Sequence, residues 1–284
     1  MEKIAVVTDT GSNLSFAQAK ELGIYLLPLQ ITIDETTYQD TLEISTQDIY
    51  KELANGKMPK TSMAAYQKIY DLFEELKKEY DTVFAIPLTN GLSTNASTMQ
   101  SIARELEMNV HVIDMYATCA LEKHVAIWIK KLVDEHKSSE EILKIIQPAI
   151  DESNSLILVK NLQHLKRGGR LTPMAATLAG LLKIYPVLHI NKSTEGRIDV
   201  LNKVRTEKRA DAYAIDKIMD DIDIEHTVIY IIHSNFLEGA DHFKKCFIEK
   251  GVPEQNIHID YISSVIAVHT GLGCIAIQYI REEN

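Results

Sequence analysis

The first half of the chain alternates short apolar runs with stretches of helical period. Residues 4–7, 82–88 and 110–115 are apolar or β-branched runs, and helix-forming sequence follows each of them. Runs of this kind predict buried strands, and their alternation with helices predicts a parallel sheet joined by helical crossovers. Because the polar loops after these strands would lie at their carboxyl ends, we expect a ligand site at that edge of the sheet.

Polar residues mark where the helices of this half begin. The pattern predicts helices at residues 46–54, 63–79, 96–106 and 117–136. Ser45 and Ser62 directly precede two of them and are expected to be their N-caps. Residues 25–33 are apolar and β-branched but contain Pro28, which favours an edge strand or an extended excursion over a central strand.

The second half has a different pattern. It contains strand-like runs at 156–159, 186–190, 198–204, 228–232, 257–262 and 274–280. The turn-rich segment 191–196 predicts a β-hairpin, and so a mixed or antiparallel sheet. We therefore predict an α/β protein of two domains, with a parallel, Rossmann-like sheet in residues 1–152 and an α/β domain with a mixed or antiparallel sheet in residues 153–284.

Composition narrows the possible partners. A net charge of -10 repels phosphate backbones and argues against nucleic acid as a partner. Three widely spaced cysteines indicate neither a disulfide framework nor a thiolate metal site. No apolar run reaches the ~18 residues that a membrane span needs, and the chain starts without a signal-like segment. We expect a soluble protein of the cytoplasm, without metal or cofactor.

One motif suggests catalysis by carboxylates. Asp9-Thr10-Gly11-Ser12 resembles the sequence around the catalytic carboxylate of aspartic proteases. That chemistry uses two carboxylates that share a proton, whereas this chain carries one copy of the motif, between a strand and a helix. We interpret Asp9 as a residue that orders the loop before the next helix.

Hydroxyl groups gather at three predicted helix starts, at Thr61-Ser62, Ser93-Thr94 and Thr172. Capping explains such residues, but helix starts that converge on one cleft also form an anion site. Residues 166–170 carry cations on a glycine-bent loop, and these cations either orient that site or are merely solvated. His269 is by default a buried structural histidine. Ser93 with His269 as its base would alternatively make a serine-type acyl hydrolase.

A group of motifs, in order, resembles one known family. The motifs are Val6-Val7-Thr8-Asp9-Thr10, Lys60-Thr61-Ser62, Gly91-Leu92-Ser93-Thr94, Gly168-Gly169-Arg170-Leu171, Arg205 and His269-Thr270-Gly271-Leu272-Gly273. Together they are similar to the landmarks of the DegV family over almost the whole chain. The resemblance implies a long-chain fatty acid bound between two α/β domains. It also implies a partner fatty acid kinase that phosphorylates the bound carboxyl group for phospholipid synthesis, so that this chain is a carrier and not an enzyme.

The resemblance also implies roles for individual residues. Thr61 and Ser93 would hydrogen-bond the carboxyl group, and Arg170 and His269 would order that network. Ser62, Thr94 and Thr270 would be neighbours in the site, and Arg205 would engage the kinase. Asn95 follows Thr94 where glycine is usual in the family. We expect a monomer that makes at most transient contact with membranes.

The acyl chain would lie in an apolar tunnel. Ile31, Ile33, Met115, Leu178, Leu181, Leu182 and Ile266 are the candidate lining residues. Ordinary core packing is the alternative role for each of them.

Overall fold

The computed structural model describes residues 2–181 and 183–282. Its first part is built on a parallel sheet with the strand order β2-β1-β6-β7, namely β2 (Tyr25–Leu27), β1 (Ile4–Asp9), β6 (Thr82–Ile86) and β7 (Val110–Val112). Every residue of β1 and β6 is buried, as the continuous apolar runs predicted. The segment with Pro28 divides into two strands. Residues 25–27 form the edge strand β2, as predicted, whereas residues 30–33 form the middle strand of another sheet, where the edge prediction was wrong.

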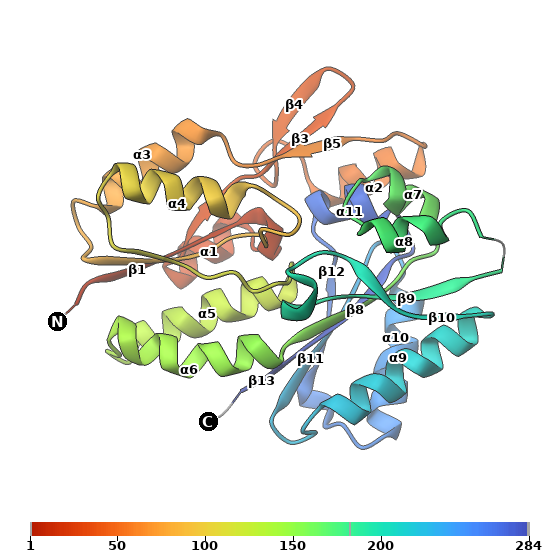
Figure 1. Cartoon of the computed structure of the whole chain (residues 1–284). Coiled ribbons are helices and arrows are strands. Elements are labelled where there is room, and N and C mark those ends of the chain that lie inside the picture. Colours follow the sequence, from red (N-terminus) through yellow and green to blue (C-terminus); the bar gives the residue numbers. More distant parts are fainter. Residues whose placement is uncertain (1, 182, 283–284) are drawn as a thin grey trace.

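Helices cover both faces of the parallel sheet (Figure 1). One core holds Val7 and Ala85 with α3 (Tyr66–Leu76) and α4 (Asn95–Glu105), and the other holds Val6 and Phe84 with α5 (Ala120–Asp134) and α6 (Ser139–Glu152). Alternate side chains of a strand point to opposite faces, which explains why neighbours in β1 enter different cores. The short α1 (Phe16–Leu22) links β1 to β2.

A small antiparallel sheet follows, with the order β4-β3-β5. It consists of β4 (Thr36–Gln39), β3 (Gln30–Ile33) and β5 (Lys60–Ser62), with α2 (Thr46–Ala54) between β4 and β5. Ser45 caps α2 as predicted, because its side chain accepts from Asp48 N. The expectation for Ser62 was wrong: Ser62 ends β5, and α3 starts only at Tyr66.

The second part is built on a mixed sheet with the order β10-β9-β8-β13-β11-β12. Its strands are β10 (Asp199–Val204), β9 (Tyr185–Ile190), β8 (Asn154–Leu158), β13 (Ile275–Arg281), β11 (Thr227–His233) and β12 (Ile257–Tyr261). Only β11 and β12 pair in parallel among these described strands. The predicted hairpin is confirmed by β9 and β10, which pair antiparallel.

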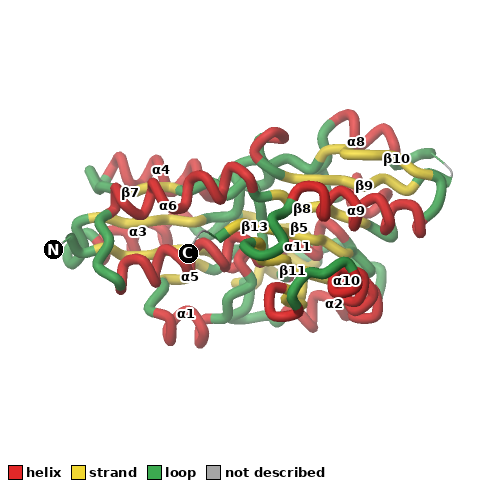
Figure 2. The backbone as a smooth tube through the Cα atoms, turned by 90° about the horizontal axis from the view of Figure 1, so that it is seen from below, coloured by secondary structure: helices red, strands yellow, loops and turns green. Residues whose placement is uncertain are grey.

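Helices lie on both sides of this sheet as well. Figures 1 and 2 place α9 (Glu207–Asp221) and α10 (Leu237–Glu249) together against one face. The other face carries α7 (Leu162–Arg167), α8 (Pro173–Leu178) and α11 (Ser264–Thr270). Three short 3-10 helices complete the described chain, η1 (Thr10–Ser12), η2 (Lys192–Thr194) and η3 (Glu254–Asn256).

The two sheets share a hydrophobic core. Ile157, Ile190 and Ala276 of the mixed sheet belong to the same buried cluster as Val7 of the parallel sheet. α6 ends at Glu152 and β8 begins at Asn154. The predicted boundary after residue 152 falls at this junction and stays a prediction, because α5 and α6 also pack against β13. Within the described residues, no helix has the length and apolarity to cross a membrane.

Candidate ligand-binding site

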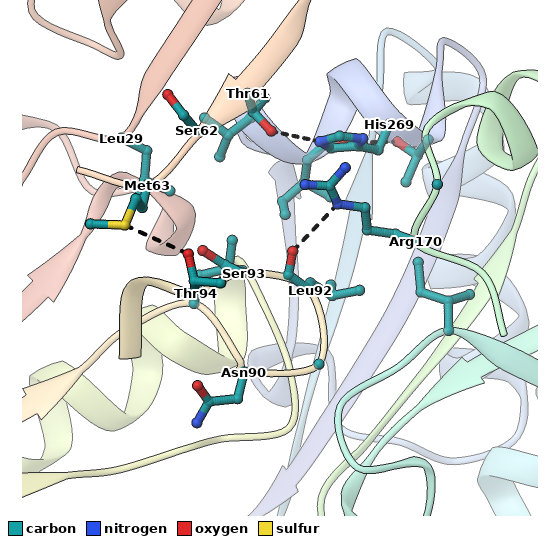
Figure 3. A pocket seen from close by; sticks show the side chains of 17 residues that line it. Leu29, Thr61, Ser62, Met63, Asn90, Leu92, Ser93, Thr94, Arg170 and His269 are labelled. Atoms are coloured by element: carbon teal, nitrogen blue, oxygen red, sulfur yellow. Dashed lines mark hydrogen bonds between the residues drawn. The ribbon is translucent and has the colours of Figure 1, made fainter. Parts of the chain in front are cut away.

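A cavity of about 440 Å³ lies where the two sheets meet. Most of its wall comes from four segments, namely β5, the loop from β6 to α4, the loop from α7 to α8, and α11, and Leu29 and Ile198 complete it. Every ligand residue expected from the sequence lines it, namely Thr61, Ser62, Ser93, Thr94, Arg170, His269 and Thr270 (Figure 3). The fold therefore brings Thr61 to His269, which lies 208 positions later in the chain.

Asp9 holds the loop that carries Ser93. Its carboxylate is fully buried and accepts hydrogen bonds from Gly11 N at 2.8 Å, Leu88 N at 2.9 Å and Asn95 Nδ2 at 2.7 Å. Burial raises the pKa of Asp9, and these three donors oppose the rise. Asp9 orders the loop after β1, as predicted. It also orders the loop after β6, which lines the cavity.

Glu122 of α5 lies beside this loop and is fully buried. Thr8 Oγ1 donates to the Ile86 carbonyl oxygen at 2.7 Å and lies 3.1 Å from Glu122 Oε1, to which it can also donate. Burial, followed by the charge of Asp9, raises the pKa of Glu122 well above its ordinary value.

Two glycines let the loops on either side of the cavity touch. A β-carbon on Gly91, in the loop after β6, would collide with the backbone of Glu195 and Gly196 in the β9–β10 connection. Gly196 has a φ of +70°, and a β-carbon there would collide with Thr89. Only glycine allows this approach without strain. The contact joins the two sheets next to Ser93.

His269 is a neutral hydrogen-bond acceptor toward Thr61. Its Nδ1 lies 3.0 Å from the Gly168 carbonyl oxygen, which can only accept, so Nδ1 carries the hydrogen. Its Nε2 lies 2.7 Å from Thr61 Oγ1 and therefore accepts the hydroxyl hydrogen (Figure 3). Burial, followed by the charge of Arg170, lowers the pKa of His269 to about 4. The imidazole is thus uncharged at neutral pH.

Arg170 brings a half-buried positive charge to the cavity. Its Nη1 donates to Gly168 O at 3.0 Å and its Nε to Leu92 O at 3.4 Å. No ion pair joins it to a carboxylate of the described residues, and its side chain lines the cavity (Figure 3). Burial lowers the pKa of Arg170. An unpaired, partly desolvated guanidinium is a site for an anion.

The other hydroxyl groups differ in how they are engaged. Ser93 Oγ accepts from Asn95 N at 3.2 Å and so keeps its hydrogen for a ligand. Thr94 Oγ1 donates to Met63 Sδ at 3.6 Å, and Thr270 Oγ1 donates to Ile266 O at 3.3 Å. Ser62 Oγ donates to Gln30 Oε1 at 3.0 Å. Ser93 is the hydroxyl best placed to donate without breaking a bond.

Most of the apolar residues that line the cavity were not predicted from the sequence. Of the candidate tunnel residues, Ile266 lines the cavity, whereas Ile31, Ile33, Met115 and Leu178 are packed in buried positions away from its wall. Leu181 is 54% exposed, and Leu182 lies outside the described residues. Leu29, Leu88, Ile198 and Val265 line the cavity instead. They come from separate segments, so no local pattern distinguishes them from core residues.

Arg205 does not line this cavity. It lies exposed between β10 and α9, beside the exposed cations Lys203, Lys208 and Arg209. No ion pair involves any of these residues in the described part of the chain. Among residues 2–181 and 183–282, no group of three or more potential ligands is placed to hold a metal ion.

Comparison with known proteins gives one consistent family. Residues 3–282 match the family model described as "Uncharacterised protein, DegV family". The DegV domain-containing protein BH3627 of Halalkalibacterium halodurans is 32% identical over 289 residues, covering 100% of both chains. The fatty acid binding DegV family protein SAG1342 of Streptococcus agalactiae has a TM-score of 0.91 at 30% identity, covering 100% of both chains. DegV of Bacillus subtilis, described as a fatty acid binding protein, has a TM-score of 0.86 at 27% identity, covering 99% of this chain and 100% of that one.

Proposed function

The chain belongs to the DegV family, and from that premise we propose that it binds a long-chain fatty acid and presents the carboxyl group to a fatty acid kinase. The related proteins of Streptococcus agalactiae and Bacillus subtilis are described as fatty acid binding, which supports the ligand class. The acyl-phosphate formed by the kinase would then feed phospholipid synthesis. In this scheme the chain is a non-catalytic carrier.

The observation that carries the proposal is the unpaired charge of Arg170 at the mouth of an apolar cavity. A carboxylate placed there would accept a charge-assisted hydrogen bond from Arg170 and a second one from Ser93. Arg170 is already partly desolvated in the protein without a ligand, and this desolvation costs free energy. An anion that pairs with Arg170 offsets that cost.

Thr61 and His269 would play a supporting part in this site. The Thr61 hydrogen is directed at Nε2 of His269, so Thr61 can donate to a carboxylate only if it leaves the imidazole without a donor. We therefore assign the direct contacts to Arg170 and Ser93, and the positioning of β5 against α11 to Thr61 and His269.

Burial of the acyl chain supplies the affinity. Each buried methylene contributes about 0.8 kcal/mol, so a long tail contributes roughly 10 kcal/mol before the cost of ordering it. The apolar residues of the cavity, among them Leu29, Leu88 and Ile266, provide that surface.

A hydrolase that uses Ser93 and His269 is disfavoured by the same geometry. Both ring nitrogens of His269 are engaged, by Thr61 and by Gly168, and no hydrogen bond joins His269 to Ser93 among the described residues. With a pKa of about 4, the imidazole is also a weak base at neutral pH. A carbonyl group, and not a carboxylate, orients the ring.

The ligand is tested by mass spectrometry of a solvent extract from the purified protein, followed by titration of delipidated protein with fatty acids. We expect a stoichiometric fatty acid in the extract. Arg170→Ala should weaken binding by about tenfold or more, since it removes a charge-assisted hydrogen bond. Lys166→Ala, a change at an exposed cation of the neighbouring α7, is the matched control and should leave affinity unchanged. An empty extract together with no binding of added fatty acid would refute the proposal.

We further propose that Arg205 and the exposed cations around it form the surface that the kinase engages. These side chains make no ion pairs in the described chain, so they are free to meet an acidic surface. Arg205→Ala should leave fatty-acid affinity unchanged and slow phosphorylation by the kinase by about fivefold or more, the range of an interface hot spot. Lys68→Ala, at an exposed cation on α3, serves as the control. Equal loss of lipid binding and phosphorylation in Arg205→Ala would contradict a docking role.

We place this cycle in the cytoplasm. The chain has three free cysteines, of which Cys119 and Cys274 are buried and Cys246 is partly buried. Unpaired thiols are typical of a reducing compartment.

A further inference from the structure

A second, narrower cavity continues from the candidate site along the mixed sheet. Leu92, Ile198, Ile266 and Thr270 line both cavities, so the two spaces adjoin. Most of its remaining wall is apolar, formed by Ile157, Ile190, Ile232, Ile262, Cys274 and Ala276. If the chain binds a fatty acid as proposed above, this is the continuation open to the tail.

The order of side chains along β13 gives the direction of this cavity. Cys274, Ala276 and Gln278 line it, and alternate residues of a strand share one face. Cys274 follows soon after α11, which carries His269, so each step along the strand leads away from the polar site. Gln278 lies about 14 Å beyond Cys274 by the rise of a strand. Ser155 is the register partner of Gln278 on β8, so both lie at the far end.

This far end is polar and incompletely paired. Gln278 is 1% exposed, and its Nε2 donates to the Thr118 carbonyl oxygen and to Ser155 Oγ, both at 2.9 Å. Because the carbonyl can only accept, these contacts fix the orientation of the amide. Gln278 Oε1 then accepts no hydrogen bond from the described residues. Ser155 Oγ accepts from Gln278 and retains its own hydrogen.

We propose that Gln278 and Ser155 form a polar floor that limits the length of the acyl chain and distinguishes a methyl end from a hydroxyl end. A methyl group against Gln278 Oε1 would bury an acceptor without a donor, which is unfavourable. A hydroxyl group can donate to Gln278 and accept from Ser155. The cavity as a whole has about 20 Å³ of free space, which is room for one water molecule. In this proposal, an acyl chain that ends short of the floor leaves room there for a water molecule, and a longer acyl chain displaces that water.

The test is a chain-length series of saturated fatty acids, measured with delipidated protein by calorimetry. Affinity should rise by about fourfold per added methylene, then fall at the length that reaches the floor. Gln278→Met removes the amide but keeps an unbranched side chain of similar size, and should move this maximum to longer chains. At the first length that fails, the ω-hydroxy acid should bind wild type about tenfold better than the plain acid, and this advantage should disappear in Gln278→Met.

Two further variants keep the test decisive. Ile277→Leu changes the packing on the opposite face of β13, away from the cavity, and should leave the maximum in place. Ser155→Ala keeps Gln278 and should reduce the ω-hydroxy advantage, which covers the case in which Gln278→Met does not fold. An unmoved maximum in Gln278→Met, an equal shift in Ile277→Leu, or no ω-hydroxy advantage in wild type would overturn the inference while fatty-acid binding stands. No binding at any length would overturn the proposed function and this inference together.

Discussion

Replacing Gly91 by alanine should lower the free energy of unfolding by about 2 kcal/mol and weaken fatty-acid binding by about tenfold. The added β-carbon meets the backbone of Glu195 and Gly196, which cannot turn aside as the end of a flexible side chain can. The loop that carries Ser93 would therefore have to separate from the β9–β10 connection. That movement opens the cavity and exposes part of the core shared by the two sheets.

The measurement for Gly91→Ala is chemical denaturation together with fatty-acid titration. Gly180→Ala is the matched control, because a β-carbon on Gly180 meets no atom within 4 Å. The control should retain both stability and affinity. If both variants behave like wild type, the loops have room that the structure does not show, and the contact does not constrain the site.

Replacing Asp9 by alanine should be the most destabilising single change at the site, with a loss of about 3 kcal/mol or more. It leaves the N–H groups of Gly11 and Leu88 and the amide of Asn95 buried without their shared acceptor. Ligand binding should fail even where the protein remains folded, because the loop after β6 loses the group that orders it.

Thermal and chemical unfolding of Asp9→Ala, compared with Asp134→Ala, checks this prediction. The Asp134 side chain is 63% exposed and forms a surface ion pair with Lys130, so its removal should change stability by less than about 0.5 kcal/mol. Comparable losses in the two variants would show that the buried hydrogen bonds of Asp9 contribute no more than an exposed ion pair.

Most strands of the two sheets could be predicted from the sequence because they are continuous apolar runs. Residues 4–7 and 82–88 became the central strands of the parallel sheet, and residues 25–27 fell at its edge. The hairpin in the second half also followed from its turn residues. These features depend on local patterns, which a single chain displays directly.

Features that depend on distant residues could not be read in this way. Ser62 looked like an N-cap because it precedes a helical pattern, yet pairing of β5 with β3 takes up that segment. Asn95 looked like a departure at the rim of the site, and it proves to be a buried donor to Asp9. The acceptors for Arg170 and His269 are backbone carbonyls, which no residue type reveals. The roles of the lining residues toward a ligand stay predictions.

The place of β13 has a consequence for how the protein is made. This strand follows every other described strand in the chain, yet it lies in the middle of the mixed sheet, between β8 and β11. During synthesis, the strands on either side must therefore wait without a shared neighbour until the ribosome has released β13. Cys274, Ala276 and Gln278 arrive with that strand, so the second cavity, which we propose for the lipid tail, is incomplete in the nascent chain until β13 is in position.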